Sequence, residues 1–183
     1  KHFHVYTSIP NVFFKKLGSK QYALKPIDLE DEEAEQFGVA DIDDLTWKQM
    51  FDGYACTECG RCTSVCPANQ TGKKLSPRKV VMDVRDRLEE IQKFKLSVND
   101  EGVVVAGESK VAGAEEAASH TLLSDHYLSE EELNACTTCN ACVEACPVNI
   151  DQLSIIVDLR RYLIMEESKM PEAWMSMSNN IEN

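Results

Sequence analysis

The sequence of 183 residues has no long apolar run, no secretory leader and no excess of positive charge. A membrane-spanning helix needs about 18 or more consecutive apolar residues, so we expect the chain as it stands to be soluble. Without a leader peptide we expect a reducing compartment, where structural disulfides rarely form. The 19 basic residues are outnumbered by 31 acidic ones, which gives a formal net charge of -12. Because phosphate binding needs a basic surface, nucleic acid is excluded as a partner.

An apolar content of 43% in 183 residues permits one or two domains with a buried core. Cysteine is missing from most of the chain. All eight cysteines fall in two stretches that repeat the pattern CxxCxxCxxxCP, namely Cys56, Cys59, Cys62, Cys66 and Pro67, then Cys136, Cys139, Cys142, Cys146 and Pro147. This pattern is the ligand run of bacterial [4Fe-4S] ferredoxins. The sequence therefore predicts two [4Fe-4S] clusters as cofactors.

The spacing within each run also predicts which cysteines share a cluster. Three cysteines at intervals of three residues can wrap three corners of a cubane in one tight loop, but the fourth corner lies beyond that loop. In paired-cluster proteins the fourth cysteine of each run binds the other cluster. We therefore expect Cys146 to join the set of Cys56, Cys59 and Cys62, and Cys66 to join the set of Cys136, Cys139 and Cys142.

Other residues of the two runs fit the same geometry. Gly60 and Asn140 precede the third cysteine of each run, and both residue types tolerate the positive φ that turns backbone amides toward a cluster. Pro67 and Pro147 lack an N–H and are expected to close the loops. Arg61, which has Ala141 as its counterpart, is predicted to raise the potential of the first cluster if its cation lies close.

Two other interpretations of the cysteines are less consistent with the pattern. Four-cysteine zinc sites use CxxC pairs and require neither a third cysteine three residues on nor a following proline. Eight cysteines in 183 residues fall below the density of a disulfide scaffold.

Helix signals flank both runs. Two pairs of residues are typical of capping boxes, namely Thr46 with Gln49 and Ser129 with Glu132. A short helix should therefore lead into the first cysteine of each run, and the helix that begins after Thr46 should end near residue 53. Longer amphipathic helices are expected at about 77–95, with a stripe of Val80, Val84, Leu88 and Ile91, and at about 150–169, with another from residue 171. Residues 96–119 suggest a small hairpin or a mobile loop.

Charged residues on the helix at 77–95 look like a solvated face, in which Asp83 and Arg87 form a favourable pair one turn apart. A basic cluster beside the first run is expected to balance cluster charge; its members are Lys73, Lys74, Arg78 and Lys79.

The fold class is therefore mainly α, with helix, cluster loop and helix occurring twice in a pseudo-twofold arrangement. Corresponding cysteines lie 80 residues apart, a separation far larger than in short βαβ ferredoxins. We expect an α-helical ferredoxin domain at residues 46–170, preceded by an arm and linker at 1–45 and followed at 171–183 by the start of a further, truncated segment.

The arm has an uneven charge distribution. Five lysines and no acidic residue occur from Lys1 to Lys25, among many aromatic and aliphatic side chains, and ten acidic residues follow from Asp28 to Asp52. Such a basic, aromatic segment suits a membrane interface. An arm packed on its own domain explains the pattern equally well.

The two runs and their flanks resemble the dicluster domain of heterodisulfide-reductase-like iron-sulfur oxidoreductases, most closely the membrane-bound members that link an electron-transfer flavoprotein to quinone. The resemblance rests on YACTECGRCTSVCPANQTGKKLSPRKVVMDVRD and LNACTTCNACVEACPVNIDQLSIIVDLRRYLI. It implies a flavoprotein or similar redox partner, further domains or subunits that carry a cysteine-rich or quinone site, and a cytoplasmic location at the inner face of the membrane. The transmembrane helices and downstream CCG motifs of those members are not found in this sequence.

No nucleophile and base stand together in the sequence, and cysteine fills every expected iron position, so we assign no catalytic residue. The sequence predicts an electron-transfer module within a larger oxidoreductase. Two alternatives remain at this point: a complete soluble iron-sulfur reductase subunit, or a four-cysteine zinc or redox-sensing structural protein.

Overall fold

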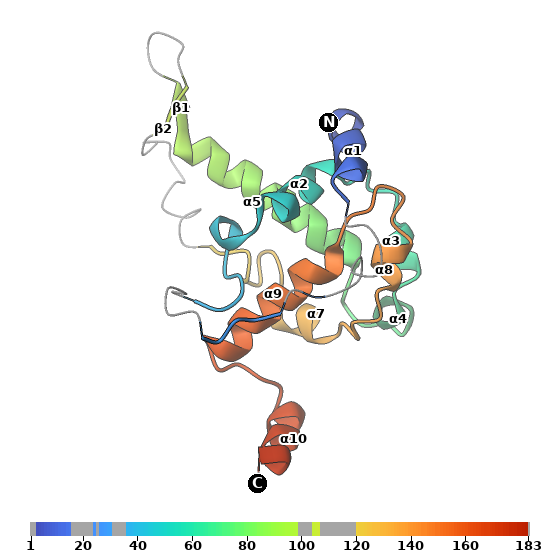
Figure 1. Cartoon of the computed structure of the whole chain (residues 1–183), viewed down its shortest axis with the longest axis vertical. Coiled ribbons are helices and arrows are strands. Elements are labelled where there is room, and N and C mark those ends of the chain that lie inside the picture. Colours follow the sequence, from blue (N-terminus) through green and yellow to red (C-terminus); the bar gives the residue numbers. More distant parts are fainter. Residues whose placement is uncertain are drawn as a thin grey trace.

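The computed structural model describes residues 3–15, 24, 26–30, 36–98, 104–106 and 120–182. Two long helices, α5 (Pro77–Lys95) and α9 (Gln152–Met165), pack against each other at the centre of the molecule (Figure 1). Around them lie α1 (His4–Phe13), a 3-10 turn η2 (Ile42–Asp44), α2 (Trp47–Ala55), α3 (Arg61–Ser64), α4 (Pro67–Gln70), α7 (Glu130–Asn134), α8 (Ala141–Glu144) and α10 (Glu172–Glu182). The predicted mainly helical class is confirmed, and helix, cysteine loop and helix do occur twice.

The core forms where the apolar stripes of the two long helices meet. Val80 and Val84 of α5 are buried in one cluster with residues of α9, and Leu88 and Ile91 pack against its edge. The α9 contribution to that cluster is Ile155, Ile156, Leu159 and Leu163. The stripe predicted for α5 is therefore confirmed, and it fixes the two halves of the chain against each other.

Both predicted capping boxes are present. Thr46 accepts from the Gln49 N–H while the Gln49 side chain accepts from the Thr46 N–H. Ser129 and Glu132 do the same at α7. The caps satisfy amides that would otherwise lack partners at each helix start, so each helix begins where the sequence predicts.

The helix ends differ more from the predictions. Helix α2 continues to Ala55, past the expected end near residue 53. Helix α9 stops at Met165 instead of near residue 169, and the chain has a positive φ of 53° further on, at Ser168.

A strap at residues 36–46 lies against α9 and depends on Gly38. Its φ is 88°, and a Cβ there would lie 2.4 Å from the carbonyl oxygen of Asp158. The Val39 N–H donates to that same carbonyl at 3.0 Å. Only glycine can bring the strap this close to the helix.

The solvated face predicted for α5 is wrong at Arg87, whose side chain is 3% exposed. Its guanidinium donates to both carboxylate oxygens of Asp41, at 3.1 and 2.7 Å, and to Glu90 at 2.7 Å. Asp83 pairs with Lys79 at 2.9 Å instead. Arg87 is buried because the strap folds over α5, and a bidentate carboxylate partner compensates for its desolvation.

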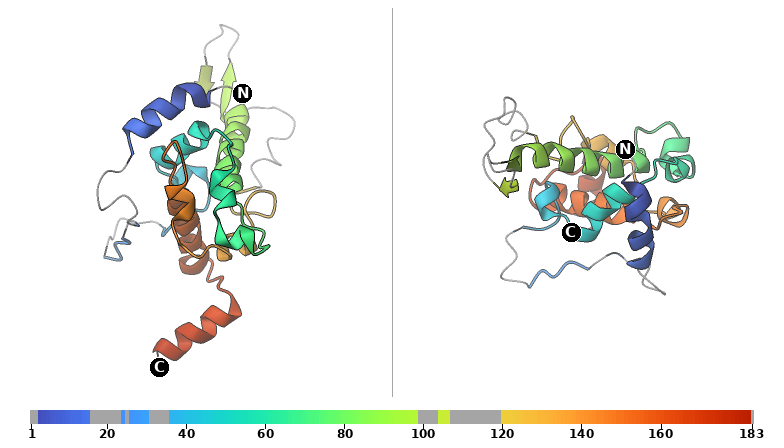
Figure 2. Two further views of the ribbon diagram at one scale, coloured as in Figure 1. Left: turned by 90° about the vertical axis from the view of Figure 1, so that its right-hand side faces the viewer. Right: turned by 90° about the horizontal axis from the view of Figure 1, so that it is seen from above.

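Helix α5 leads into an antiparallel pair, β1 (Leu96–Val98) and β2 (Val104–Ala106), in which Ser97 is opposite Val105. The two strands of the hairpin alternative are therefore confirmed, although residues 99–103 and 107–119 of that prediction lie outside the described residues. The pair extends beyond the end of α5, and α10 projects away from the other helices (Figure 2). Within the described part of the chain, none of the helices combines the length and the apolar character needed to cross a bilayer.

Helix α1 packs against α2, as in the alternative of an arm packed on its own domain, but it does so through polar side chains that the sequence did not single out. Thr7 and Asn11 are buried. The Thr7 hydroxyl donates to the Tyr54 carbonyl at 2.8 Å, and the Asn11 amide donates to Asp52 Oδ1 at 2.9 Å. The arm is thus packed on its own domain through α1, but Lys1, Lys16, Lys20 and Lys25 lie outside the described residues.

Candidate functional site

The first cysteine loop surrounds a small cavity together with one cysteine from the other half of the chain. Cys56, Cys59 and Cys62 line it, and Cys146 completes the set. The other lining residues are Thr57, Gly60, Arg78, Pro147, Val148, Ile150 and Gln152. Four thiols from segments about 80 residues apart thus face one space.

A second cavity has the reciprocal composition. Cys136, Cys139 and Cys142 line it, and Cys66 completes the set. Its other lining residues are mostly apolar and comprise Leu75, Pro77, Thr137, Asn140, Leu153 and Ile156. The structure therefore brings the eight cysteines into the two groups of four that the sequence predicted to share clusters, while the ligation itself stays a prediction.

The two cavities are neighbours. Helix α3 of the first loop contacts α8 of the second, as Figure 1 shows on the right of the molecule. Cys62 and Cys142 belong to one buried apolar cluster with Val143 and Leu153. Apolar side chains thus pack against cysteines of both sets, and the hydrophobic shell around such a site influences its potential.

Positive φ angles shape both loops, at two positions in each. Gly60 (79°) and Asn140 (61°) have the left-handed conformation that was predicted, and they cap α3 and α8. Glu58 (55°) and Thr138 (54°) share it but were missed, because neither residue type favours it. Their position two residues after the first cysteine of each run was the available signal.

The turn at Thr138, and a further positive φ of 57° at Asn149 just after the second run, accompany backbone N–H groups that donate to sulfur. The Thr138 N–H donates to Cys136 Sγ at 3.4 Å, and the Ile150 N–H donates to Cys146 Sγ at 3.4 Å. A hydrogen bond from the Glu58 backbone likewise lowers the pKa of Cys56 in part. Such N–H groups stabilise thiolate over thiol, which is the form that binds iron.

Burial nevertheless dominates the thiol pKa values. It raises the pKa of Cys142 to about 12, and the nearby Cys136 adds to the rise. It also raises the pKa of Cys56, with further contributions from Cys62 and Cys146. Burial thus raises the pKa of two thiols in each set, namely Cys56 and Cys62 in the first and Cys136 and Cys142 in the second, and these thiols hold their protons until a metal displaces them. The convergent sulfurs and N–H groups therefore fit a [4Fe-4S] cluster with four cysteine ligands.

Cations lie beside both sets, but not the one predicted. Arg61 is exposed and is not among the residues that line the first cavity, whereas Arg78 is. Near the second set, Arg160 donates to the carbonyls of Leu133 and Cys136, and burial lowers its pKa. Of the basic cluster, Lys74 and Lys79 pair with acidic residues of α7, and the charge-balancing role stays a prediction, for which Arg78 has the required position.

The two prolines take different roles. Pro67 starts α4 at its first position, where the missing N–H costs nothing. Pro147 lines the first cavity. Among the described residues, no group of three or more histidine, cysteine or acidic side chains has the geometry to hold a single metal ion.

Residues 55–150 match the 4Fe-4S dicluster domain family. The chain belongs to this family. Its dicluster domain spans both cysteine loops and the helix α5 between them, and its cofactors are two 4Fe-4S clusters. The resemblance seen in the cysteine runs is therefore confirmed.

Full-length relatives contain much more than this dicluster domain. The chain is 38% identical to the "Probable iron-sulfur-binding oxidoreductase FadF" of Bacillus subtilis, with all of this chain and 28% of that protein covered. It is 34% identical to the "EtfAB:quinone oxidoreductase" of Syntrophomonas wolfei, with 100% of this chain and 26% of that protein covered. It is 35% identical to the "Probable membrane-anchored ferredoxin" of Chromohalobacter salexigens, with 94% of this chain and 26% of that protein covered. The chain thus spans about a quarter of these curated relatives, and no solved structure matches it significantly.

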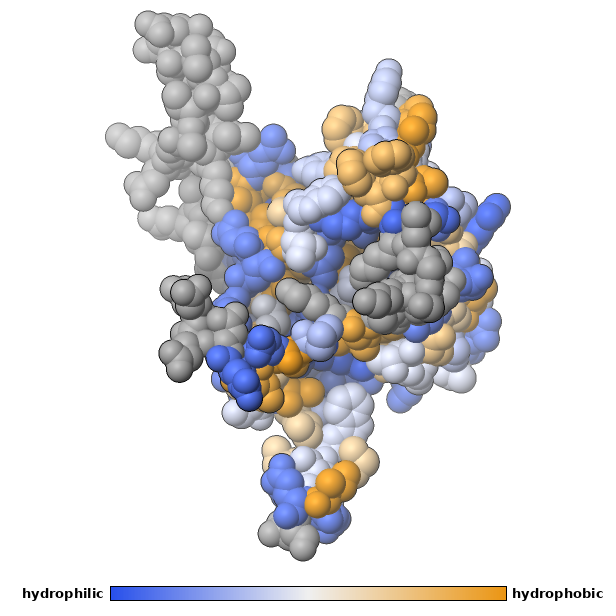
Figure 3. Space-filling view, viewed as in Figure 1, coloured by the Kyte–Doolittle hydropathy of each residue, from blue (hydrophilic) through white to orange (hydrophobic). Residues whose placement is uncertain are grey.

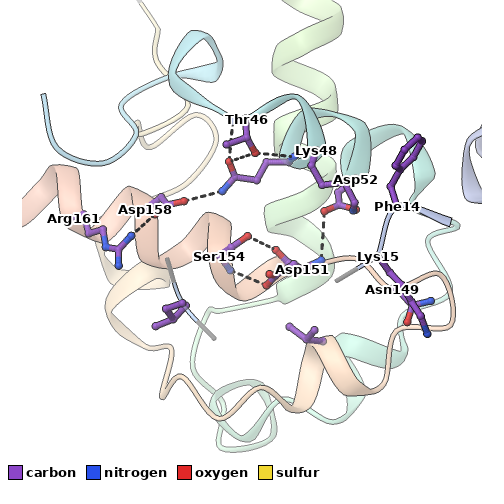
Figure 4. A pocket seen from close by; sticks show the side chains of 13 residues that line it. Phe14, Lys15, Thr46, Lys48, Asp52, Asn149, Asp151, Ser154, Asp158 and Arg161 are labelled. Atoms are coloured by element: carbon purple, nitrogen blue, oxygen red, sulfur yellow. Dashed lines mark hydrogen bonds and ion pairs between the residues drawn. The ribbon is translucent and has the colours of Figure 1, made fainter. Parts of the chain in front are cut away.

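A larger cavity of about 280 Å³ lies beside the dicluster domain's second loop, between the end of α1, the start of α2 and α9 (Figure 4). Its polar walls are internally paired: Gln49 donates to Asp158 at 2.8 Å and Arg161 pairs with Asp158 at 2.9 Å. The buried Asp52 carboxylate accepts from Lys48 at 2.6 Å. Of these contacts, the one between Gln49 and Asp158 joins α2 to α9, and the other two lie within one helix each.

Proposed function

We propose that this chain is an electron-transfer module that carries two [4Fe-4S] clusters within a larger oxidoreductase. The observation that supports it most is the presence of two adjacent four-cysteine cavities in one helical domain. The proposed ligands are Cys56, Cys59, Cys62 and Cys146 for one cluster and Cys66, Cys136, Cys139 and Cys142 for the other. The domain that holds them is residues 46–170, between an arm and linker at 1–45 and a further segment at 171–183.

Each transfer moves a single electron. A [4Fe-4S] cluster held by each set of four cysteines would supply one-electron transfer between a donor and an acceptor, through its 2+ and 1+ states. The four cysteines of each set would fill every iron position, which would leave none open for a bond to a substrate. The chain acts in this scheme as a relay.

The relatives suggest what the relay connects. One of them is named for an EtfAB and quinone activity, so we propose an electron-transfer flavoprotein as donor and a quinone site elsewhere in the full-length protein as acceptor. A disulfide-type acceptor is the alternative that follows from the heterodisulfide-reductase resemblance of the cysteine runs. Both would belong to segments or subunits beyond residues 1–183.

Cluster content and reducibility test the proposal. Anaerobically purified or reconstituted protein is expected to hold about eight iron and eight sulfide atoms per chain, to absorb near 400 nm and to give an electron-paramagnetic signal on reduction. Reduced electron-transfer flavoprotein should bleach that absorption in rapid mixing. Zinc in place of iron would refute the assignment, and clusters that dithionite reduces but the flavoprotein does not would refute the proposed donor.

We further propose that α1 docks the module on a membrane at the cytoplasmic face. The helix buries its polar side and exposes an apolar one: Tyr6, Ile9 and Phe13 are 77%, 76% and 79% exposed. Their spacing of three and four residues puts them on one face, and apolar side chains gather on α1 in the space-filling view (Figure 3). Lysines of the arm would add attraction to anionic lipid of about 1 kcal/mol for each one near the surface.

Replacing Tyr6, Ile9 and Phe13 by serine is expected to weaken sedimentation with anionic vesicles roughly 100-fold or more. Burying one such side chain contributes about 1.5–3 kcal/mol, and each 1.4 kcal/mol is about tenfold in affinity. The matched control replaces three exposed apolar residues of α10, namely Met175, Met177 and Ile181, by serine. Equal binding by both variants, or by a chain that starts at Pro26, would remove the role of α1. A higher salt concentration should weaken only the electrostatic contribution of the lysines to vesicle binding, because salt screens charges.

A further inference from the structure

We propose that Gln152 donates a hydrogen bond to the cluster of the Cys56 loop and raises its reduction potential. This inference rests on the proposed function, because it requires a cluster in that cavity. It adds a residue that lies outside both cysteine runs and that nothing in their spacing points to. Gln152 acts here as a tuning residue, since cysteine alone holds the iron.

The position of Gln152 is fixed by the start of α9. Asp151 caps the helix by accepting from the Ser154 N–H at 3.0 Å, and its own N–H donates to Asp52 at 3.4 Å. Just before it, the Ile150 N–H donates to Cys146 Sγ. The segment that carries the fourth cysteine of the first set thus continues directly into Gln152, whose side chain lines the same cavity.

The side-chain amide of Gln152 is buried, but its oxygen has no hydrogen-bond partner among the described residues. The residue is 2% exposed. A buried polar group left without a partner costs about 1–3 kcal/mol, and native proteins rarely leave one. The two ends of a glutamine amide exchange by a simple flip, so the NH₂ end can face the cavity. Cluster sulfides and thiolates are acceptors that can use it.

The second cavity has no such group from this helix. The residues of α9 that line it are Leu153 and Ile156, both apolar and buried. Gln152 lines the first cavity and not the second. A change at Gln152 should therefore shift the potential of the first cluster alone, and the second cluster of the same molecule serves as the internal reference.

The direction of the effect follows from charge. Reduction adds one negative charge to the cluster, and an N–H donor stabilises the more negative state more strongly. Hydrogen bonds to cluster sulfur are one of the established determinants of potential in this class of cofactor. Removing the donor should therefore make the cluster harder to reduce.

Redox titration of Gln152→Met, followed by electron-paramagnetic resonance, tests the inference. Methionine keeps the length of the side chain and removes the N–H. The equilibrium constant for reduction of the first cluster is expected to fall about tenfold, so its midpoint potential should fall by about 59 mV for one electron. The midpoint potential of the second cluster should not change. Cys59→Ser, which alters the first loop only, assigns the two signals.

The matched control is Gln49→Met. Gln49 is also a buried glutamine, but its amide donates to Asp158 and it lines neither cysteine cavity. This change should lower stability while both midpoints stay unchanged. A second readout is a nitrogen coupling on the reduced first cluster in protein labelled with ¹⁵N-glutamine, which Gln152→Met should abolish and Gln49→Met should keep.

Unchanged midpoints in Gln152→Met, with both clusters fully present, would overturn the inference and leave the proposed function standing. An equal shift of both midpoints would also overturn it, because a general change in solvent access then explains the result. Absence of clusters from the unmodified protein would refute the proposed function itself, and the inference with it.

Discussion

Cys146→Ser is expected to remove or distort the cluster of the Cys56 loop and to spare that of the Cys136 loop. Cys146 follows the second loop in sequence, but it lines the first cavity with Cys56, Cys59 and Cys62. Serine oxygen is a poorer ligand for iron than thiolate. If the affected cluster is lost, iron should fall from about eight to about four atoms per chain.

The reciprocal variant is the control. Cys66 lines the second cavity with Cys136, Cys139 and Cys142, so Cys66→Ser should affect the cluster that Cys146→Ser leaves intact. Electron-paramagnetic spectra of both variants, compared with Cys59→Ser and Cys139→Ser as markers of each loop, decide the pairing. If Cys146→Ser instead reproduced the spectrum of Cys139→Ser, each run would bind its own cluster and the cross-ligation would be wrong.

Removal of iron is expected to unfold both loops and to lower the melting temperature by about 10 °C or more. Each cluster would join segments about 80 residues apart, so its binding free energy is part of the folding free energy. A contribution of only about 4 kcal/mol corresponds to that shift in a chain of this size. Helices α3 and α8 span four residues each, and helices so short do not persist alone.

Hydrogen exchange on the two forms would locate the effect. The amides of Thr138 and Ile150, which donate to sulfur, should lose roughly 100-fold or more of their protection without iron. Amides in the α5 and α9 core, such as those of Val84 and Ile156, should lose less, because that core is apolar. Treatment with chelator but no oxidant, which leaves the clusters in place, is the control. Full helicity and an unchanged melting temperature in the apo form would contradict the prediction.

Local signals account for the features that the sequence predicted correctly. Capping boxes at Thr46 and Ser129 act within three residues, so their helices begin as expected. The stripe containing Val80 and Val84 depends only on helical periodicity. The left-handed turns at Gly60 and Asn140 follow from residue types that accept positive φ.

Features that depend on distant partners could not be predicted in this way. Arg87 looked solvent-facing until the strap brought Asp41 to it. Helix α1 contains Pro10 and turns polar side chains inward, against the usual pattern, because Asp52 and the Tyr54 carbonyl offer them partners. Glu58 and Thr138 adopt positive φ despite their residue types, since the loops aim their N–H groups at sulfur.

The sequence by itself determined the class of cofactor: eight cysteines in two runs of the same spacing predict four sulfur ligands for each of two clusters, because spacing within a tight loop sets which ligands can converge. Only the tertiary structure decided what surrounds them. It placed Arg78 rather than Arg61 at the first cavity and brought the amide of Gln152 to it, while the second cavity received Leu153 and Ile156. The environment of a cluster is built by the packing of α5 and α9, which are far apart in the chain, and no local pattern encodes that contact.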